Sequence, residues 1–112
     1  MPRTTIAEAQ KASYELFKEI TERRNQNEHK SMTWTPFALV TNLLEEAGEV
    51  ASVVKGLEGY KPPDKPKTKE MLGVELSDLL YTVFALAETY GVDLEQSYQQ
   101  TTCGYRTRFL KR

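Results

Sequence analysis

Two acidic motifs inside apolar helical patterns constrain this chain more than any other feature. The first motif contains Glu45, Glu46 and Glu49, and the second contains Glu75 and Asp78. Leucine and valine residues surround both motifs, although a buried carboxylate without a partner is energetically costly. Residues three apart lie on one face of an α-helix, so Glu46 pairs with Glu49 and Glu75 pairs with Asp78. Each helix therefore presents two carboxylates on a single face.

The segment between the motifs predicts how the two faces meet. A turn centred on Pro62 would fold the helices back as an antiparallel pair. Glu46 would then lie opposite Asp78, and Glu49 opposite Glu75. Four carboxylates at one level repel one another unless they bind protons, basic groups or a cation. Because the ligand set holds oxygen atoms alone, without His or Cys, it favours Mg²⁺, or Mn²⁺ as the alternative, over Zn²⁺. The sequence thus predicts a divalent metal site held by Glu46, Glu49, Glu75 and Asp78.

The rest of the chain is patterned as helices, and no segment has the length and alternation of a convincing β-strand. We expect helices over residues 4–24, from Thr35-Pro36 to about Leu57, from about Thr68 to Tyr90, and after Asp93. Residues 25–33 and the Pro- and Lys-rich residues 58–68 would connect them. Gly56 and Gly59 would end the second helix, and Gly91 the third. We therefore predict one all-α domain over residues 1–112, with four helices.

Composition and charge restrict the class of protein. Fifteen basic and sixteen acidic residues give a formal net charge of -1, which argues against a general nucleic-acid-binding protein. Cys103 is the single cysteine, and the chain has neither a signal-peptide pattern nor an apolar run long enough to span a membrane. We expect a cytoplasmic protein in a reducing compartment. The wide apolar surface from Leu79 to Ala87 predicts a homodimer or homotetramer that completes the helical bundle.

Several features leave two interpretations open. Gly48, inside the second helix, either allows close helix packing or leaves room beside the carboxylates for a metal, water or phosphate. The connector over residues 58–68 is either a solvated linker or a flap whose lysines approach bound phosphates. The basic residues 105–112 form either a solvated tail or a phosphate clamp. His29, the single histidine, is expected to be an exposed loop residue without a catalytic role.

The two motifs and their flanks resemble a known family. Glu45-Glu46-x-x-Glu49, then 25 intervening residues, then Glu75-x-x-Asp78 is similar to the signature of the MazG-like, all-α nucleoside triphosphate pyrophosphohydrolases. The resemblance spans roughly residues 34–109 and includes the flanks Thr35-Pro36, Leu79-Leu80-Tyr81 and Gly91-Val92-Asp93-Leu94-Glu95. A single Glu-x-x-Glu is common on helices, whereas two such motifs in this order with these flanks form a specific combination.

The resemblance implies a reaction and a role for each matching residue. It implies Mg²⁺-dependent cleavage of a (deoxy)nucleoside triphosphate between the α- and β-phosphates, giving the monophosphate and pyrophosphate, as nucleotide-pool house-cleaning. Metal ions suit this chemistry because they neutralise phosphate charge and activate water. The implied metal ligands are Glu46, Glu49, Glu75 and Asp78, with Glu45 as the additional acid that orients or deprotonates water.

The residues expected to contact the substrate match the pattern of the family less completely than the metal ligands do. Relatives often carry a lysine, and an arginine four residues later, in the last helix, but here those positions are Gly104 and Arg108. Arg108 is therefore the expected phosphate ligand, and Lys67, Lys69 or Arg106 would substitute for the missing lysine. Trp34 is either a wall of the base pocket, where stacking tolerates different bases, or an ordinary core or interface residue.

Two other classes of protein compete with the enzyme. A non-catalytic helical module would oligomerise or sense nucleotide without turnover, and the missing lysine at Gly104 is the feature that favours it. A di-iron carboxylate bundle ranks last, because such sites normally need Glu-x-x-His pairs and neither acidic motif contains histidine. The preferred base and sugar do not follow from the sequence.

Overall fold

The computed structural model describes residues 3–27, 35–60 and 66–110, in which all regular structure is α-helical. The all-α, four-helix prediction is therefore confirmed. Residues 25–27, which were predicted as loop, belong to the first helix, and residues 105–109 are the last turns of the fourth rather than a frayed end. The helices are α1 (Ile6–Asn27), α2 (Pro36–Leu57), α3 (Lys69–Thr89) and α4 (Leu94–Phe109).

Each helix starts at a short polar side chain that caps its first turn. The Thr35 hydroxyl accepts a hydrogen bond from the Ala38 N–H at 3.2 Å, with Pro36 at the first helical position. Thr5, Thr68 and Asp93 each accept the N–H three residues later in the same way, at 3.1, 3.2 and 3.0 Å. Such caps satisfy backbone donors that have no partner within the helix, so the starts are encoded locally.

Glycines in the left-handed conformation end α2 and α3. Gly59 has φ of 72° and Gly91 has φ of 64°, a region in which L side chains are strained. The N–H groups of Gly91 and Val92 bond back to the carbonyls of Glu88 and Ala87 at 3.1 and 2.9 Å, which forms a Schellman motif. The predicted terminators are thus confirmed, except that Gly56 lies within α2 rather than at its end.

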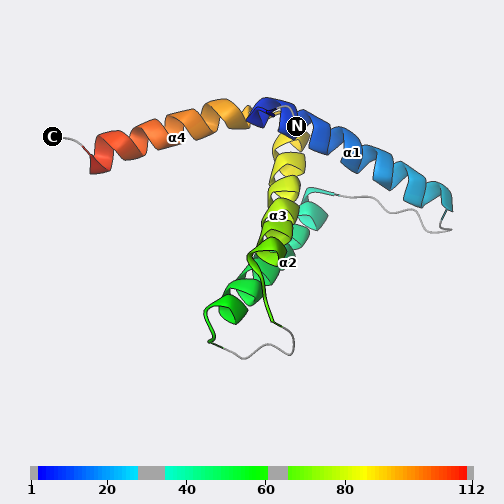
Figure 1. The fold of residues 1–112 in the computed structure, drawn as a ribbon. Helices are drawn as coiled ribbons and strands as arrows, with labels where there is room; N and C mark the ends of the chain where they lie inside the picture. Colours follow the sequence, from blue (N-terminus) through cyan, green and yellow to red (C-terminus); the bar gives the residue numbers. More distant parts are fainter. Residues whose placement is uncertain (1–2, 28–34, 61–65, 111–112) are drawn as a thin grey trace.

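The helices are arranged as an antiparallel pair with two arms (Figure 1). α2 and α3 pack along each other, α1 crosses the C-terminal part of α3, and α4 projects away from the pair, with α1 as its main contact. Gln10 links α1 to the connection between α3 and α4. Its side chain is buried, donates to Glu88 Oε2 and the Val92 carbonyl at 2.8 and 2.6 Å, and accepts from the Leu94 N–H at 3.3 Å.

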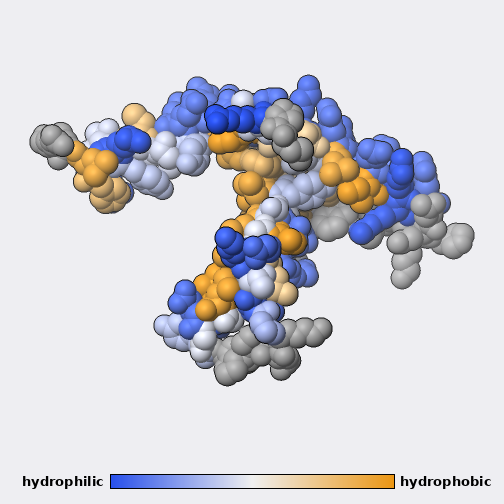
Figure 2. All heavy atoms as spheres, in the orientation of Figure 1, coloured by the Kyte–Doolittle hydropathy of each residue, from blue (hydrophilic) through white to orange (hydrophobic). Residues whose placement is uncertain are grey.

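This arrangement leaves a small core and much exposed apolar surface. Within the described ranges, the buried apolar residues are Leu39, Val53, Phe84 and Ala85. Phe37, Leu44 and Leu80 are 86%, 68% and 51% exposed, and Figure 2 shows hydrophobic surface along the α2–α3 pair and near the end of α4. The radius of gyration is 17.3 Å, against about 13 Å for a compact domain of this length. A single chain is therefore an open structure.

No helix in the described part of the chain is long and apolar enough to cross a membrane.

Candidate metal centre

Three of the predicted carboxylates meet between α2 and α3. Glu46 on α2, together with Glu75 and Asp78 on α3, can each offer one oxygen so that all three atoms lie within 4.8 Å of one another. The antiparallel packing of the two helices brings them to the same level, and the spacing of three residues keeps Glu75 and Asp78 on one face of α3. The cluster therefore has the spacing needed to surround a single cation.

Two oxygens of this cluster lack a partner that the protein supplies. Glu46 Oε2 and Glu75 Oε2 are shielded from solvent and accept no hydrogen bond from any described residue. Over the same ranges the structure has one ion pair, Arg23 with Glu19 at 3.3 Å on the outside of α1, so no basic side chain neutralises the cluster. Shielded acceptors without a donor are uncommon and costly, and a cation is the group that would satisfy both.

The electrostatics of the cluster favour bound protons in the absence of a metal. Burial raises the pKa of the Glu46 carboxyl, and the neighbouring carboxylates, Glu49 first, raise this pKa further. The adjacent Glu49 carboxyl is the largest cause of the raised pKa of Glu75, because a proton shared between the two carboxyls favours the neutral form; burial and then repulsion from Glu49 and Asp78 raise this pKa further. Both shifts have the direction expected when like charges converge.

The remaining two acids lie at the edge of the cluster. Glu49 is exposed and falls outside the group of three, although its carboxyl acts on both Glu46 and Glu75. Glu45 is also exposed and acts on Glu46 through its charge. The donor set is thus made of carboxylate oxygens alone, and it fits a hard divalent cation such as Mg²⁺ or Mn²⁺. Three ligands are gathered here, with Glu49 beside them as the fourth candidate.

Two of the predicted phosphate ligands lie where α3 begins. Lys69 is the exposed first residue of α3, and Lys67 precedes the helix. Lys67 is half-buried, and its side chain occupies the space that a Cβ at Gly56 would fill. The aliphatic part of Lys67 thus holds this end of the connector against α2. Trp34 and His29 lie outside the described residues.

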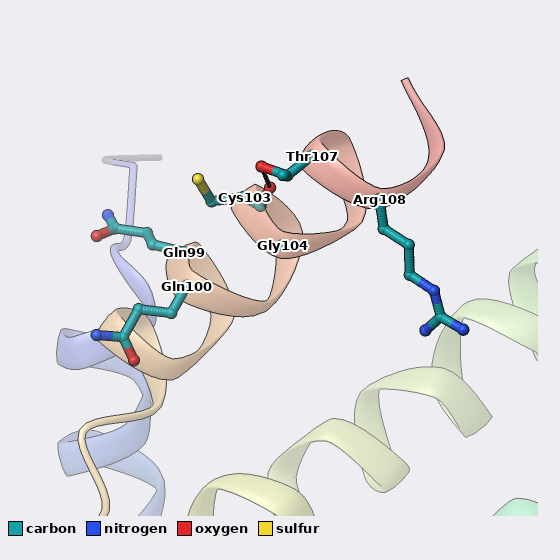
Figure 3. A pocket seen from close by; sticks show the side chains of 6 residues that line it. All are labelled: Gln99, Gln100, Cys103, Gly104, Thr107 and Arg108. Carbon is teal, nitrogen blue, oxygen red and sulfur yellow. Dashed lines mark hydrogen bonds between the residues drawn. The ribbon is translucent and has the colours of Figure 1, made fainter. Parts of the chain in front are cut away.

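The structure does not bring Arg108 to the acidic cluster of its own chain. Arg108 is near the end of α4, which extends away from α2 and α3 (Figure 1). Its guanidinium lies 5.0 Å from the centre of the Phe109 ring, and Figure 3 shows the side chain pointing away from Gln99 and Cys103. A Cβ at Gly104 would meet nothing within 4 Å, so the position of the absent lysine is open. A phosphate role for Arg108 therefore requires a second copy of the chain or a movement of α4.

One pair of residues near the cluster was not predicted from the sequence. The Asn42 side-chain amide donates to the Thr82 hydroxyl at 2.9 Å, across the α2–α3 interface. Both are polar residues within apolar stretches. Asn42 lies four residues before Glu46, and Thr82 lies four residues after Asp78. That spacing, which continues the face of each acidic motif by one helical turn, is the signal that could have identified them.

Comparison with known proteins agrees with this geometry. Residues 34–109 match the family described as the MazG nucleotide pyrophosphohydrolase domain. The uncharacterized protein YvdC of Bacillus subtilis is 35% identical over 96 residues, which covers 80% of this chain and 82% of that protein. The uncharacterized protein YpjD of the same organism is 28% identical over 75 residues, covering 67% and 68% of the two chains. The family match covers most of the chain and includes both acidic motifs. The chain belongs to the MazG nucleotide pyrophosphohydrolase domain family.

Proposed function

We propose that this protein is a divalent-metal-dependent pyrophosphohydrolase that cleaves a (deoxy)nucleoside triphosphate between its α- and β-phosphates. The observation that carries the proposal is the cluster of Glu46, Glu75 and Asp78, in which two shielded oxygens lack any donor among the described residues. Membership of the MazG family supplies the class of reaction. A nucleotide is the substrate, and Mg²⁺ is the first choice of cation.

The position of each carboxylate suggests its role in the reaction. Glu46, Glu75 and Asp78 would hold the cation, and Glu49, which acts on both glutamates, would complete the set. When bound, the cation offsets the charge of the phosphates and activates water for attack. Glu45 is exposed beside Glu46 and is therefore free to orient that water or to accept its proton.

Basic side chains near the start of α3 would bind the phosphates. Lys69 is exposed at the N-terminal end of the helix, where the helix dipole also favours an anion. Lys67 is held against Gly56 and so has a restricted position, which reduces the entropy lost when it contacts a phosphate. The interpretation of the connector as a phosphate-binding flap is the one that we retain.

Pyrophosphate release tests the proposal directly. The chain should release pyrophosphate and a nucleoside monophosphate from at least one member of a panel of ribo- and deoxyribonucleoside triphosphates in Mg²⁺, and EDTA should abolish the release. Glu75→Gln should remove the activity. Glu70→Gln is the matched control, because Glu70 lies on the exposed first turn of the same helix and outside the cluster.

The same assay separates the enzyme from the non-catalytic module. A module that senses nucleotide would bind it in calorimetry while releasing no pyrophosphate from any member of the panel. Equal activity in Glu75→Gln and Glu70→Gln would contradict the assignment of the metal site.

A further inference from the structure

The direction of α4 has little support from apolar packing. No described side chain of α4 is buried, and the helix projects away from the α2–α3 pair with α1 as its main contact (Figure 1). The residues that join it to α3 begin with Gly91, which has φ of 64°. Because burial of an apolar face is what normally holds a helix in place, another interaction must fix the direction in which α4 leaves the fold.

Hydrogen bonds at the start of α4 provide this support, in a group that we call the α1–α4 junction. It consists of Ala7, Gln10, Glu88, Val92, Leu94 and Glu95. The Leu94 N–H of α4 donates to Gln10 Oε1 of α1 at 3.3 Å. In the opposite direction, the Ala7 N–H of α1 donates to Glu95 Oε1 of α4 at 3.4 Å. N–H groups in the first turn have no acceptor within their own helix, so each helix caps the other only while the two keep this position.

Gln10 is the central residue of the junction. Its side chain is 5% exposed, and its amide nitrogen donates to Glu88 Oε2 at 2.8 Å and to the Val92 carbonyl at 2.6 Å. A glutamine amide has two N–H groups and one oxygen, so all of them are engaged once the bond from Leu94 is counted. A buried backbone group that loses its partner costs more than the bond itself contributes. One side chain thus ties α1 to the end of α3, to the connecting residues and to the start of α4.

The direction of α4 decides where its basic end lies. Arg106 and Arg108 are in the last turn of the helix, and Leu94 is its first residue. Arg108 is fourteen residues from Leu94, roughly 21 Å along the axis, so a rotation of about 20° at the junction would displace it by about 7 Å. Charge-assisted hydrogen bonds to phosphate need distances of about 2.7–2.9 Å. A rotation of this size would therefore remove a phosphate contact completely.

We infer that Gln10 is a positioning residue for the reaction, because it fixes the direction of α4 and so the place at which Arg108 meets the phosphates. The inference rests on the proposed function and on the phosphate role expected for Arg108. With the junction intact, α4 does not fold back toward its own acidic cluster, so Arg108 serves the site of a second copy. Gln10 lies before residues 34–109, which match the family, and no role for it follows from that match.

Distances between two spin labels test the direction of α4. The native Cys103 is exposed on α4, and Lys55→Cys adds a second label at an exposed position of α2. Refolding together with an excess of the unlabelled Cys103→Ser chain isolates the distance within one chain. Gln10→Met removes the hydrogen bonds at similar size, so this distance should shift or broaden by several Å. Gln26→Met, the same change at an exposed position of α1, is the matched control and should leave the distance unchanged.

A pair of charge-exchanging variants keeps the test decisive if Gln10→Met does not fold. Gln10→Glu retains the acceptor for the Leu94 N–H but sets a second carboxylate against Glu88, so α4 should again be displaced. Adding Glu88→Gln returns an amide donor to the pair with the roles exchanged, and the native distance should be partly restored. A side chain at position 10 that only fills space would give no such rescue, because glutamine and glutamate are nearly the same size.

Nucleotide kinetics test the consequence for the reaction. Gln10→Met should lower kcat/KM by roughly tenfold or more, mainly by raising KM, as expected when a charged phosphate contact is lost, while the Mg²⁺ affinity stays that of the native chain. The double variant Gln10→Met, Arg108→Ala should be no worse than Arg108→Ala alone, because both changes remove the same contact. Losses that add, or a label distance that stays unchanged in Gln10→Met and Gln10→Glu, would show that Gln10 does not act through α4, and the inference would be wrong.

Failure of the proposed function would give a different result. Calorimetry with nucleotides that carry a non-hydrolysable α,β-methylene bridge measures phosphate binding without turnover. A native chain that releases no pyrophosphate, but in which Gln10→Met both displaces α4 and weakens the binding of these analogues, would refute the enzyme and support the inference. An active native chain in which Gln10→Met displaces α4 without any loss of kcat/KM would refute the inference alone.

Discussion

Replacement of Gly48 by alanine tests whether this glycine serves the fold or the site. Gly48 lies in the interior of α2, two residues after Glu46 and directly before Glu49, and it is exposed. A Cβ added there would meet nothing within 4 Å. Close helix packing is therefore not the reason for this glycine within one chain, and room beside the carboxylates is the interpretation that remains.

The expected change in the free energy of unfolding follows from helix propensity alone. Glycine in a helix interior is about 1 kcal/mol less favourable than alanine, and no contact at this position offsets the gain. Gly48→Ala should therefore raise the free energy of unfolding of the metal-free protein by about 1 kcal/mol. For 112 residues, the typical unfolding entropy per residue converts this gain into an increase in Tm of about 4 °C.

Thermal and urea unfolding in EDTA measure the effect, with two glycines as references. Gly104→Ala in α4 also places its methyl group in open space and should stabilise by a similar amount. Gly56→Ala places its methyl group against the Lys67 side chain, so it should stabilise less or destabilise. If Gly104→Ala stabilises and Gly48→Ala does not, a neighbour covers Gly48 in solution and the reasoning is refuted. Weaker Mg²⁺-dependent nucleotide binding by a stabilised Gly48→Ala would show that the glycine keeps the site open.

Four further outcomes are expected. Glu49→Gln and Asp78→Asn should each weaken Mg²⁺ or Mn²⁺ binding strongly in calorimetry, and unchanged binding in both variants would contradict the metal site. Either change should also stabilise the metal-free protein, because it relieves repulsion between the carboxylates. Because the pKa values of Glu46 and Glu75 are raised above 4.5 in the folded state, that state binds more protons than the unfolded chain. Urea midpoints of the metal-free protein should therefore fall as the pH rises above about 4.5, and saturating Mg²⁺ should remove this trend. Light scattering at micromolar concentration should show a homodimer or homotetramer, since side chains such as Phe37 and Leu44 are exposed in one chain, and a monomer would refute this. Arg108→Ala should raise KM or lower kcat more than Arg106→Ala does, with Tm and metal affinity nearly unchanged; because α4 extends away from its own cluster, the effect would arise at the site of a second copy.

The sequence by itself determined the features that depend on neighbours along the chain. The caps at Thr35, Thr68 and Asp93 and the terminator at Gly91 act within four residues, so their residue types were enough to predict the helix limits closely. The register of the acidic motifs is equally local, because a spacing of three fixes which carboxylates share a helix face. A prolyl connector between two apolar helices then left the antiparallel pair as the simplest way to bury both.

Tertiary structure alone decided the features that depend on how the helices cross. It shields Glu46 and Glu75 while leaving Glu49 at the edge of the cluster, and it directs α4 away from the α2–α3 pair. It also forms a cavity between α1 and the α2–α3 pair and joins Asn42 to Thr82, which are 40 residues apart in the sequence. Helix crossing angles result from the packing of many side chains that are distant in the sequence, and no short motif encodes all of these contacts.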